Sequence, residues 1–310
     1  MAHGGPGIKV TYESSRSKLL FLTTPMETKI SLSDVSELSQ NAMRGPQNGS
    51  FPGCAILALR MIQTINHGSI REVRLNRPPV NALTSEVLVA LRKAISSAAK
   101  EDVKALVLSG APGRFSAGLD VPALMQLDRR GIATLWRDLY AAMKAIASSP
   151  IPIAAAITGH APAGGTVLAL FCDWRVMAEG DFKIGLNEVQ VGVPLPAVIL
   201  AGLRRQVGAR NAEHLASSGL LMTPAQAVTA GLIDEIAPVD RVVERAMAWC
   251  QGLLELPHQA MRITRTQARA DLAGLFQKNF APEVKRVVTA WWHPETQATL
   301  RSLVERLGKK

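Results

Sequence analysis

The sequence predicts an α/β protein in which strands and helices alternate first and helices alone follow. Residues 103–109 and 151–157 are apolar runs with the length and composition of buried strands. Each run leads into a turn of small residues, at 113–121 and at 158–165. From residue 242 to the end, nearly every stretch has apolar residues at helical spacing.

The composition is that of a folded protein with a large core. Of its 310 residues, 47% are hydrophobic and 19% are charged, which argues against global disorder. The formal net charge of +10 favours an anionic partner: a phosphorylated cofactor, a nucleic acid or a membrane surface. Because the lysines and arginines are dispersed rather than gathered in a block, we expect no nucleic-acid partner.

The cysteines and histidines point to no metal and no disulfide. Cys54, Cys172 and Cys250 are far apart, and the six histidines are isolated from one another. This pattern predicts no metal site and a reducing compartment. We expect the cytoplasm of a bacterial-type cell or, as a second choice, the mitochondrial matrix.

One apolar stretch, residues 151–172, is long enough to raise the question of a membrane span. Its histidine, prolines and glycines, with Asp173 and Arg175 soon after, favour a buried strand, turn and helix instead. The first residues lack the basic segment followed by an apolar one that marks a secretory signal. We therefore expect no membrane span and no such signal.

The first third of the chain divides near residue 60. Residues 1–55 are rich in Ser, Thr, Gly and Pro, which predicts a poorly ordered extension. A hairpin of two strands is predicted from Met61. After a proline-bound loop at 76–83, Thr84 is expected to cap a helix at 85–100.

The middle of the chain predicts further helices. Apolar residues recur at helical spacing over 124–148, and shorter helices are expected at 200–207, 210–219 and 223–231. Residues 232–239 are predicted to be a short apolar connection.

The two small-residue turns and one carboxylate form the candidate site. A turn dense in glycine lets a backbone N–H approach a ligand, because no Cβ stands in the way. Two such turns could aim two N–H groups at one oxygen, which would be an oxyanion hole. Glu188 is the sole carboxylate between Asp181 and Glu213 and lies in an apolar run, where a raised pKa would suit a general base.

Each of these features also has a purely structural interpretation. Gly164 and Gly165 after a strand can be only a tight connection, and Glu188 can lie on the solvated face of a strand. The presence of two such turns in one chain is what favours the catalytic interpretation.

Three motifs carry a resemblance to a known family. They are FSAGLD at 115–120, GHAPAGG at 159–165 and CDWR at 172–175. With them, the chain resembles the crotonase (enoyl-CoA hydratase/isomerase) superfamily over roughly residues 61–307. The run IGLNEVQVG at 184–192 is similar to the mitochondrial-type delta3,delta2-enoyl-CoA isomerases of that family.

The resemblance implies a fold and an assembly. It implies a spiral of ββα units over 61–240 and a helical C-terminal region, 241–310, that joins subunits into a homotrimer or a dimer of trimers. We expect the tail at 277–307 to help close the assembly, because its apolar residues exceed what one chain readily hides. These residues are Phe280, Val287, Val288, Trp291 and Trp292.

The resemblance also implies the roles of site residues. The oxyanion donors would be the N–H groups of Leu119 and Gly164, and Glu188 would be the acid–base. The substrate would be an acyl-coenzyme A thioester, with no separate cofactor, and the proline-bound loop at 76–83 would lie near its adenine end. The residues expected to contact substrate are Ala117, Gly118, Leu119, Asp120, Val121, Gly164 and Gly165.

Three functions remain open at this point. The typical hydratase of the family has a second glutamate three residues after the oxyanion glycine, where this chain has Val167. That departure favours an isomerase that moves a double bond from position 3 to position 2 with one base. The alternatives are an enoyl-CoA hydratase or other acyl-CoA enzyme of this fold, and a non-catalytic RNA-binding protein. Asp120 is expected to cap or brace its loop.

Overall fold

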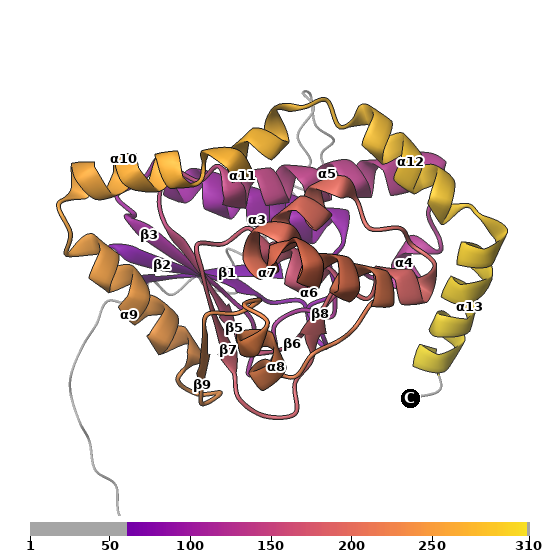
Figure 1. The fold of residues 1–310 in the computed structure, drawn as a ribbon, viewed down its shortest axis with the longest axis horizontal. Coiled ribbons are helices and arrows are strands. Elements are labelled where there is room, and N and C mark those ends of the chain that lie inside the picture. The colour runs from indigo at the N-terminus through magenta and orange to yellow at the C-terminus, as the bar shows by residue number, and fades with distance from the viewer. Residues whose placement is uncertain (1–60, 309–310) are drawn as a thin grey trace, which may run out of the picture. The chain divides into compact units, whose positions relative to one another are not determined.

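The computed structural model describes residues 61–308, so the predicted extension at 1–55 lies outside the described residues (Figure 1). The strands are β1 (Ile62–His67), β2 (Ile70–Leu75), β3 (Ala105–Ser109), β4 (Gly113–Arg114), β5 (Ile153–Ile157), β6 (Gly159–Pro162), β7 (Trp174–Ala178), β8 (Ile184–Gly185) and β9 (Glu235–Ala237). The helices up to residue 229 are α3 (Ser85–Ala98), α4 (Val121–Leu124), α5 (Arg129–Ala147), α6 (Gly164–Leu170), the 3-10 helix η1 (Glu188–Val191), α7 (Ala197–Ser218) and α8 (Pro224–Thr229). The later helices are α9 (Val242–Leu254), α10 (His258–Ala268), α11 (Ala270–Gly274), the 3-10 helix η2 (Leu275–Gln277), α12 (Ala281–Trp291) and α13 (Pro294–Gly308).

The strands form two sheets. The larger has the order β1-β2-β3-β5-β7-β9, with β1 and β2 antiparallel and every later pair parallel. The smaller has the order β4-β6-β8 and is parallel throughout. Successive strands therefore alternate between the sheets: β3, β5 and β7 belong to the larger and β4, β6 and β8 to the smaller.

Along the chain, these strands come in the pairs β3–β4, β5–β6 and β7–β8, and at least one helix follows each pair. The chain is therefore a spiral of ββα units. α4 and α5 follow β4, α6 follows β6, and η1 and α7 follow β8. The predicted fold class is confirmed, because an α/β core of such units comes first and five α-helices from α9 to α13 close the described chain.

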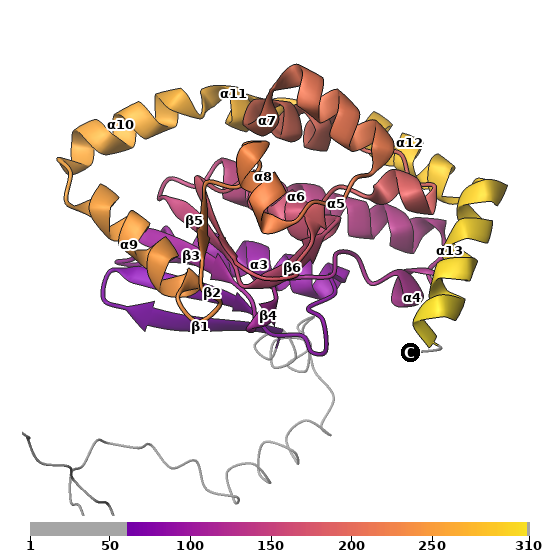
Figure 2. The ribbon, with the colours of Figure 1, turned by 60° about the horizontal axis from the view of Figure 1, so that its bottom comes forward.

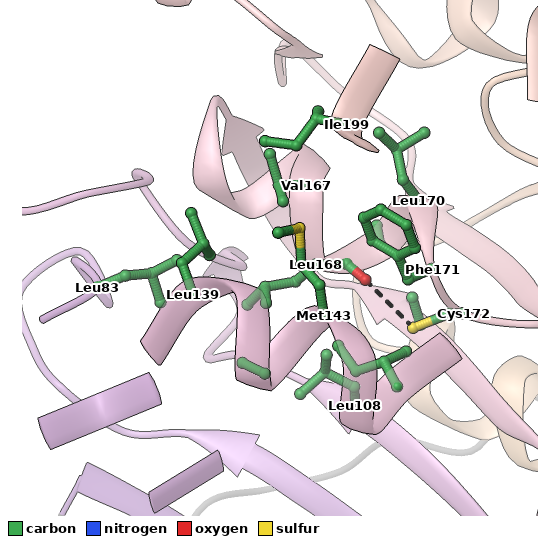
Figure 3. Packing of buried hydrophobic residues seen from close by; sticks show 14 of the residues in the cluster. Leu83, Leu108, Leu139, Met143, Val167, Leu168, Leu170, Phe171, Cys172 and Ile199 are labelled. Carbon is green, nitrogen blue, oxygen red and sulfur yellow. Dashed lines mark hydrogen bonds between the residues drawn. The ribbon is translucent and has the colours of Figure 1, made fainter. Parts of the chain in front are cut away.

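The larger sheet separates two apolar clusters. Side chains alternate along β3 and β5, so Leu106, Leu108, Ile153 and Ala155 face one cluster, and Ala105, Val107, Ala154 and Ala156 face the other. The first cluster also holds the buried faces of α3, α5 and α6, and the second is covered by α9. Figure 3 shows the first cluster around α6, where Val167 and Leu168 lie among Met143, Leu139 and Ile199.

Three local predictions differ from the structure, and a fourth agrees with it. Thr84 occupies the N-cap position of α3, but its hydroxyl makes no capping bond and is buried without a partner within residues 61–308. The helix expected at 124–148 begins later, at Arg129, because Asp128 accepts the N–H of Gly131 at 2.7 Å and caps α5. Residues 232–239 contain β9. The two helices expected at 200–207 and 210–219 are present as the two parts of α7, which non-helical backbone divides at Gly208, where φ is +77°.

The C-terminal helices divide into packed and unpacked ones. Val287 and Trp291 of α12 are buried, and Phe280, Val288 and Trp292 pack against the same cluster. The reason given above for an intersubunit role of these residues is therefore wrong, because the chain hides them itself. α10, by contrast, buries none of its residues. In space, α10 and α13 lie on opposite sides of the described residues (Figure 2).

No helix within residues 61–308 combines the length and the apolar character that a membrane crossing requires. The same residues contain no group of three or more His, Cys, Asp or Glu side chains placed to hold a metal ion.

Candidate active site

The spiral brings the predicted site residues to one edge of the smaller sheet. Leu119 follows β4, Gly164 follows β6 and Glu188 follows β8, and these three parallel strands are neighbours. The carboxyl ends of parallel strands meet at one edge, where open α/β sheets bind their ligands. Each of the three residues thus lies on a connection that leaves this edge.

The first turn is held by the proline-bound loop before α3. The N–H of Leu83 donates to the carbonyl of Gly118 at 2.8 Å, and the N–H of Asp120 donates to the carbonyl of Leu83 at 3.1 Å. The N–H of Leu119, between these two bonds, donates to no acceptor of the described chain. A backbone N–H left free in a fixed turn can donate to a ligand.

Gly118 brings the first turn against the second. Its φ is +84°, which favours glycine, and a Cβ added there would lie 3.0 Å from the backbone nitrogen of Gly164. Gly165 is similarly close to the first turn, since an added Cβ would lie 2.7 Å from the carbonyl oxygen of Ser116. The two turns therefore contact each other through backbone atoms, which requires glycine at these positions.

The second turn directs the N–H of Gly164 away from protein acceptors. Ala163 has φ of 48° and ψ of −118°, a positive-φ conformation that is strained for a residue with a Cβ. Gly164 is the first residue of α6, so its N–H has no partner inside the helix, and none is present elsewhere in residues 61–308. Leu119 and Gly164 thus each offer a free N–H from turns that touch.

Thr166 joins the second turn to the segment that carries Glu188. Its buried hydroxyl lies 2.6 Å from the carbonyl oxygen of Ala161 and 3.1 Å from that of Gly185, and it accepts the N–H of Gly185 at 2.9 Å. The N–H of Ala163 also donates to the carbonyl of Gly185, at 2.8 Å. The start of α6 and the end of β8 are therefore fixed to each other, three residues before Glu188.

Glu188 begins η1 with a carboxyl group withdrawn from water. Its Oε2 is buried and has no hydrogen-bond partner among the described residues, and Oδ1 of Asn187 is in the same condition. Burial raises the pKa of the Glu188 carboxyl to about 7. A carboxyl group with this pKa can both accept and return a proton near neutral pH.

Asp120 is engaged as a structural residue. Its carboxylate accepts the N–H of Ala123 at 3.1 Å, which caps α4, and it forms an ion pair of 2.6 Å with Arg77. The expectation that Asp120 caps or braces the loop is confirmed. Ala117, whose N–H donates to the carbonyl of Val80 at 2.9 Å, and Val121, which begins α4, flank the free N–H of Leu119.

Three supporting residues were missed in the sequence. Thr166 is one, and Asn81 and Arg77 are the others. Asn81, with φ of 52°, donates from Nδ2 to the carbonyl of Phe115 at 3.1 Å and accepts the N–H of Arg77 at 2.9 Å. An asparagine after Pro-Pro-Val was the available signal, because asparagine tolerates the left-handed conformation better than most residues.

A surface cavity of about 890 Å³ lies beside η1 and does not include the free N–H groups. Its lining residues come from the loop after Glu188, from α12 and from the start of α13. They are Val189, Gly192, Val193, Pro194, Pro282, Lys285, Arg286, Thr289, Ala290, His293, Glu295 and Thr296. The segment that follows Glu188 therefore forms part of the wall of this cavity.

The class of protein follows from the fold and from comparison with known sequences. Residues 65–309 match the family described as enoyl-CoA hydratase/isomerase, and the chain belongs to that family. The ββα spiral with its backbone turns is the crotonase fold of this family.

Relatives of both named activities are similar to the chain. The human mitochondrial enoyl-CoA delta isomerase 1 is 30% identical over 243 residues, which cover 77% of this chain and 80% of that protein. Its mouse counterpart is 28% identical over 253 residues, 81% of this chain and 88% of that protein. A probable enoyl-CoA hydratase of Mycolicibacterium paratuberculosis is 35% identical over 221 residues, 69% of this chain and 83% of that protein.

Solved structures of an isomerase and of a hydratase are also similar to the chain. The crystal structure of human mitochondrial delta3-delta2-enoyl-CoA isomerase matches with a TM-score of 0.77 and 28% identity, covering 80% of this chain and 98% of that one. An enoyl-CoA hydratase from Bacillus halodurans matches with a TM-score of 0.72 over 78% of this chain and 99% of that one, and its 22% identity supports the fold alone. The family and fold are thus established, and the choice between its activities depends on the site.

Proposed function

We propose that the protein is an isomerase that converts 3-enoyl-CoA to trans-2-enoyl-CoA, as in fatty-acid β-oxidation. The observation that carries the proposal is the single buried carboxyl group of Glu188, with its raised pKa, at the sheet edge that also holds the free N–H groups of Leu119 and Gly164. The similarity to isomerases from human and mouse supports the same choice.

In the proposed reaction, the two N–H groups hold the thioester oxygen. Glu188 removes a proton from C2, and the electron pair of the C–H bond moves into the carbonyl to give a dienolate whose oxygen carries negative charge. The N–H groups stabilise that charge, and one such donor is typically worth a factor of about 10²–10³ in rate. Reprotonation at C4 by Glu188 leaves the double bond between C2 and C3.

Val167 is the residue that argues against hydration. It stands where the family's typical hydratase has a second glutamate, and in this structure it is 1% exposed and belongs to the apolar core. Valine can neither orient water nor exchange a proton. A site without a second acid is suited to a proton shift that keeps water away from the conjugated product.

The decisive experiment supplies trans-3-hexenoyl-CoA and crotonyl-CoA separately to the purified protein. Absorbance of the conjugated thioester should rise with the first substrate and stay nearly constant with the second. A fall with crotonyl-CoA and no rise with trans-3-hexenoyl-CoA would contradict isomerisation.

Hydration is the second candidate, because hydratase-named relatives reach 34–36% identity. It requires an acid–base group other than Val167, and the same absorbance assay tests it. RNA binding without catalysis is the remaining alternative, suggested only by the net charge of +10. Binding of that kind should weaken steeply as salt concentration rises.

We also propose that the protein assembles as a homotrimer or a dimer of trimers. The supporting feature is α10, which buries none of its residues and exposes 43% of Ile263. Light scattering at micromolar concentration should give the mass of three or six chains, and Ile263→Glu should lower it. A monomeric wild-type protein would contradict this proposal. The expected compartment, cytoplasm or mitochondrial matrix, stays a prediction.

A further inference from the structure

The last helix, α13, contacts both halves of the candidate site. It packs against α4, which begins two residues after Leu119, and against η1, which begins at Glu188. Figure 2 shows α13 beside α4 at one side of the described chain. Because the oxyanion turn and the acid–base residue leave different strands, an element that contacts both can set the distance between them.

Thr296 makes the polar contact between α13 and the segment that follows Glu188. Its side chain is 3% exposed, and its hydroxyl donates to the carbonyl of Gly192 at 2.7 Å. The N–H of Gly192 donates to the carbonyl of Glu188, and the N–H of Val193 donates to the same oxygen at 3.0 Å. The Thr296 hydroxyl is therefore two hydrogen bonds away from the backbone of Glu188.

Gly192 is suited to this contact in two ways. Its φ of +74° lies in the left-handed region that favours glycine. A Cβ added to it would lie 3.1 Å from Cα of Thr296 and 3.2 Å from the Thr296 hydroxyl. The close approach of α13 to the loop thus requires that no side chain stand at position 192.

The carboxyl group of Glu188 depends on its backbone for its position. No described side chain binds its Oε2, so only packing and the hydrogen bonds of η1 hold it. These bonds include one from Nε2 of Gln190 to the carbonyl of Gly219 at 2.9 Å, on the side of α7. Thr296 supplies the corresponding bond on the side of α13.

We propose that Thr296 is a positioning residue for the reaction. It holds the segment 188–193, here called the catalytic loop, so that the Glu188 carboxyl group faces C2 of the substrate. This inference rests on the proposed isomerase function. The substrate itself is expected to be held by the turns at 113–121 and 158–165. Loss of the Thr296 hydroxyl should therefore lower kcat and leave KM nearly unchanged.

The test compares three variants with wild type on trans-3-hexenoyl-CoA. Thr296→Val should lower kcat by about 10–10²-fold, with KM within about threefold, because small misplacements of a reacting group cost rates of this size. Thr296→Ser should restore most of the rate. Thr299→Val is the control, because within residues 61–308 the Thr299 hydroxyl donates only to the carbonyl of Glu295, in its own helix, at 2.9 Å. An unchanged kcat in Thr296→Val, or a Thr296→Ser protein as slow as it, would overturn the proposal.

A second measurement does not depend on turnover. Amide hydrogen exchange at Val193 should be faster in Thr296→Val than in wild type, while exchange at Val107 in β3 should be unchanged. A wild-type protein that fails to isomerise would contradict the proposed function, and unchanged exchange at Val193 would contradict the coupling itself. If Thr296→Val does not fold, Thr296→Ala is measured in its place, with the same expected results.

Discussion

Burial has two effects on the Glu188 carboxyl group. It raises the pKa to about 7, so the group can accept a proton near neutral pH, and it makes the ionised form less stable. Glu188→Gln, which is nearly the same size, should retain binding of the coenzyme A thioester and lose isomerisation by about 10²–10⁴-fold, the usual contribution of a general base. Calorimetric binding and the absorbance assay measure the two effects separately. Turnover at the wild-type rate would exclude Glu188 as the base.

The same burial makes stability depend on pH. The pKa of Glu188 is raised to about 7 in the folded chain from 4.5, the value for a free carboxyl group. Between these two values the folded chain binds a proton that the unfolded chain has lost, so this residue makes unfolding easier as pH rises. Glu188→Gln should therefore raise the free energy of unfolding at pH 8, by up to about 3 kcal/mol, and change it little at pH 4. Urea unfolding at the two pH values tests this, and an equal effect at both would contradict it.

Gly118 allows a separate test of the oxyanion turn. Gly118→Ala places a Cβ 3.0 Å from the nitrogen of Gly164 and should abolish most turnover by separating the two turns. Gly68→Ala is the matched control: its φ is +62°, and an added Cβ meets no atom within 4 Å. Both variants should lose about 1–2 kcal/mol of stability from the left-handed backbone, and only the first should lose activity. Equal activity in the two would argue against a role for this contact.

At the scale of elements, a buried ion-pair network fastens α10 to the larger sheet. Asp173 binds Arg265 through two contacts of 2.8 Å and Arg269 at 3.2 Å, and it accepts the N–H of Ile153 in β5. Asp173→Asn should cost about 3–5 kcal/mol, because it leaves the guanidinium groups of Arg265 and Arg269, whose side chains are only 11% and 10% exposed, without their carboxylate. Chemical denaturation measures this cost. A loss below about 1 kcal/mol would show that water replaces the carboxylate.

The elements also show what the sequence could predict. The apolar runs at β3 and β5 and the small-residue turns after them were recognisable, because burial in a parallel sheet demands such composition. The contacts through Thr166, Asn81 and Thr296 were not, because each joins segments distant in sequence by a single hydroxyl or amide group. The capping role expected of Thr84 was wrong, since a local cap pattern does not determine which way a hydroxyl turns.

At the scale of the whole molecule, the chain from Met61 should be sufficient for activity. The described elements begin at Ile62, and the match to the enoyl-CoA hydratase/isomerase family begins at residue 65. A protein of residues 61–310 should fold and turn over trans-3-hexenoyl-CoA as the full chain does. Circular dichroism and the absorbance assay test this, and loss of either fold or activity would assign a role to residues 1–60.

The contact of Thr296 with Gly192 has a consequence for synthesis. Chains are made from the N-terminus, so the strands that lead to Leu119, Gly164 and Glu188 are complete well before α13 exists. A nascent chain that stops before Pro294 has every reacting group of the proposed mechanism and lacks the hydroxyl that holds the catalytic loop. If Thr296 has the proposed positioning role, a nascent chain should therefore reach its full rate only once α13 has left the ribosome and packed.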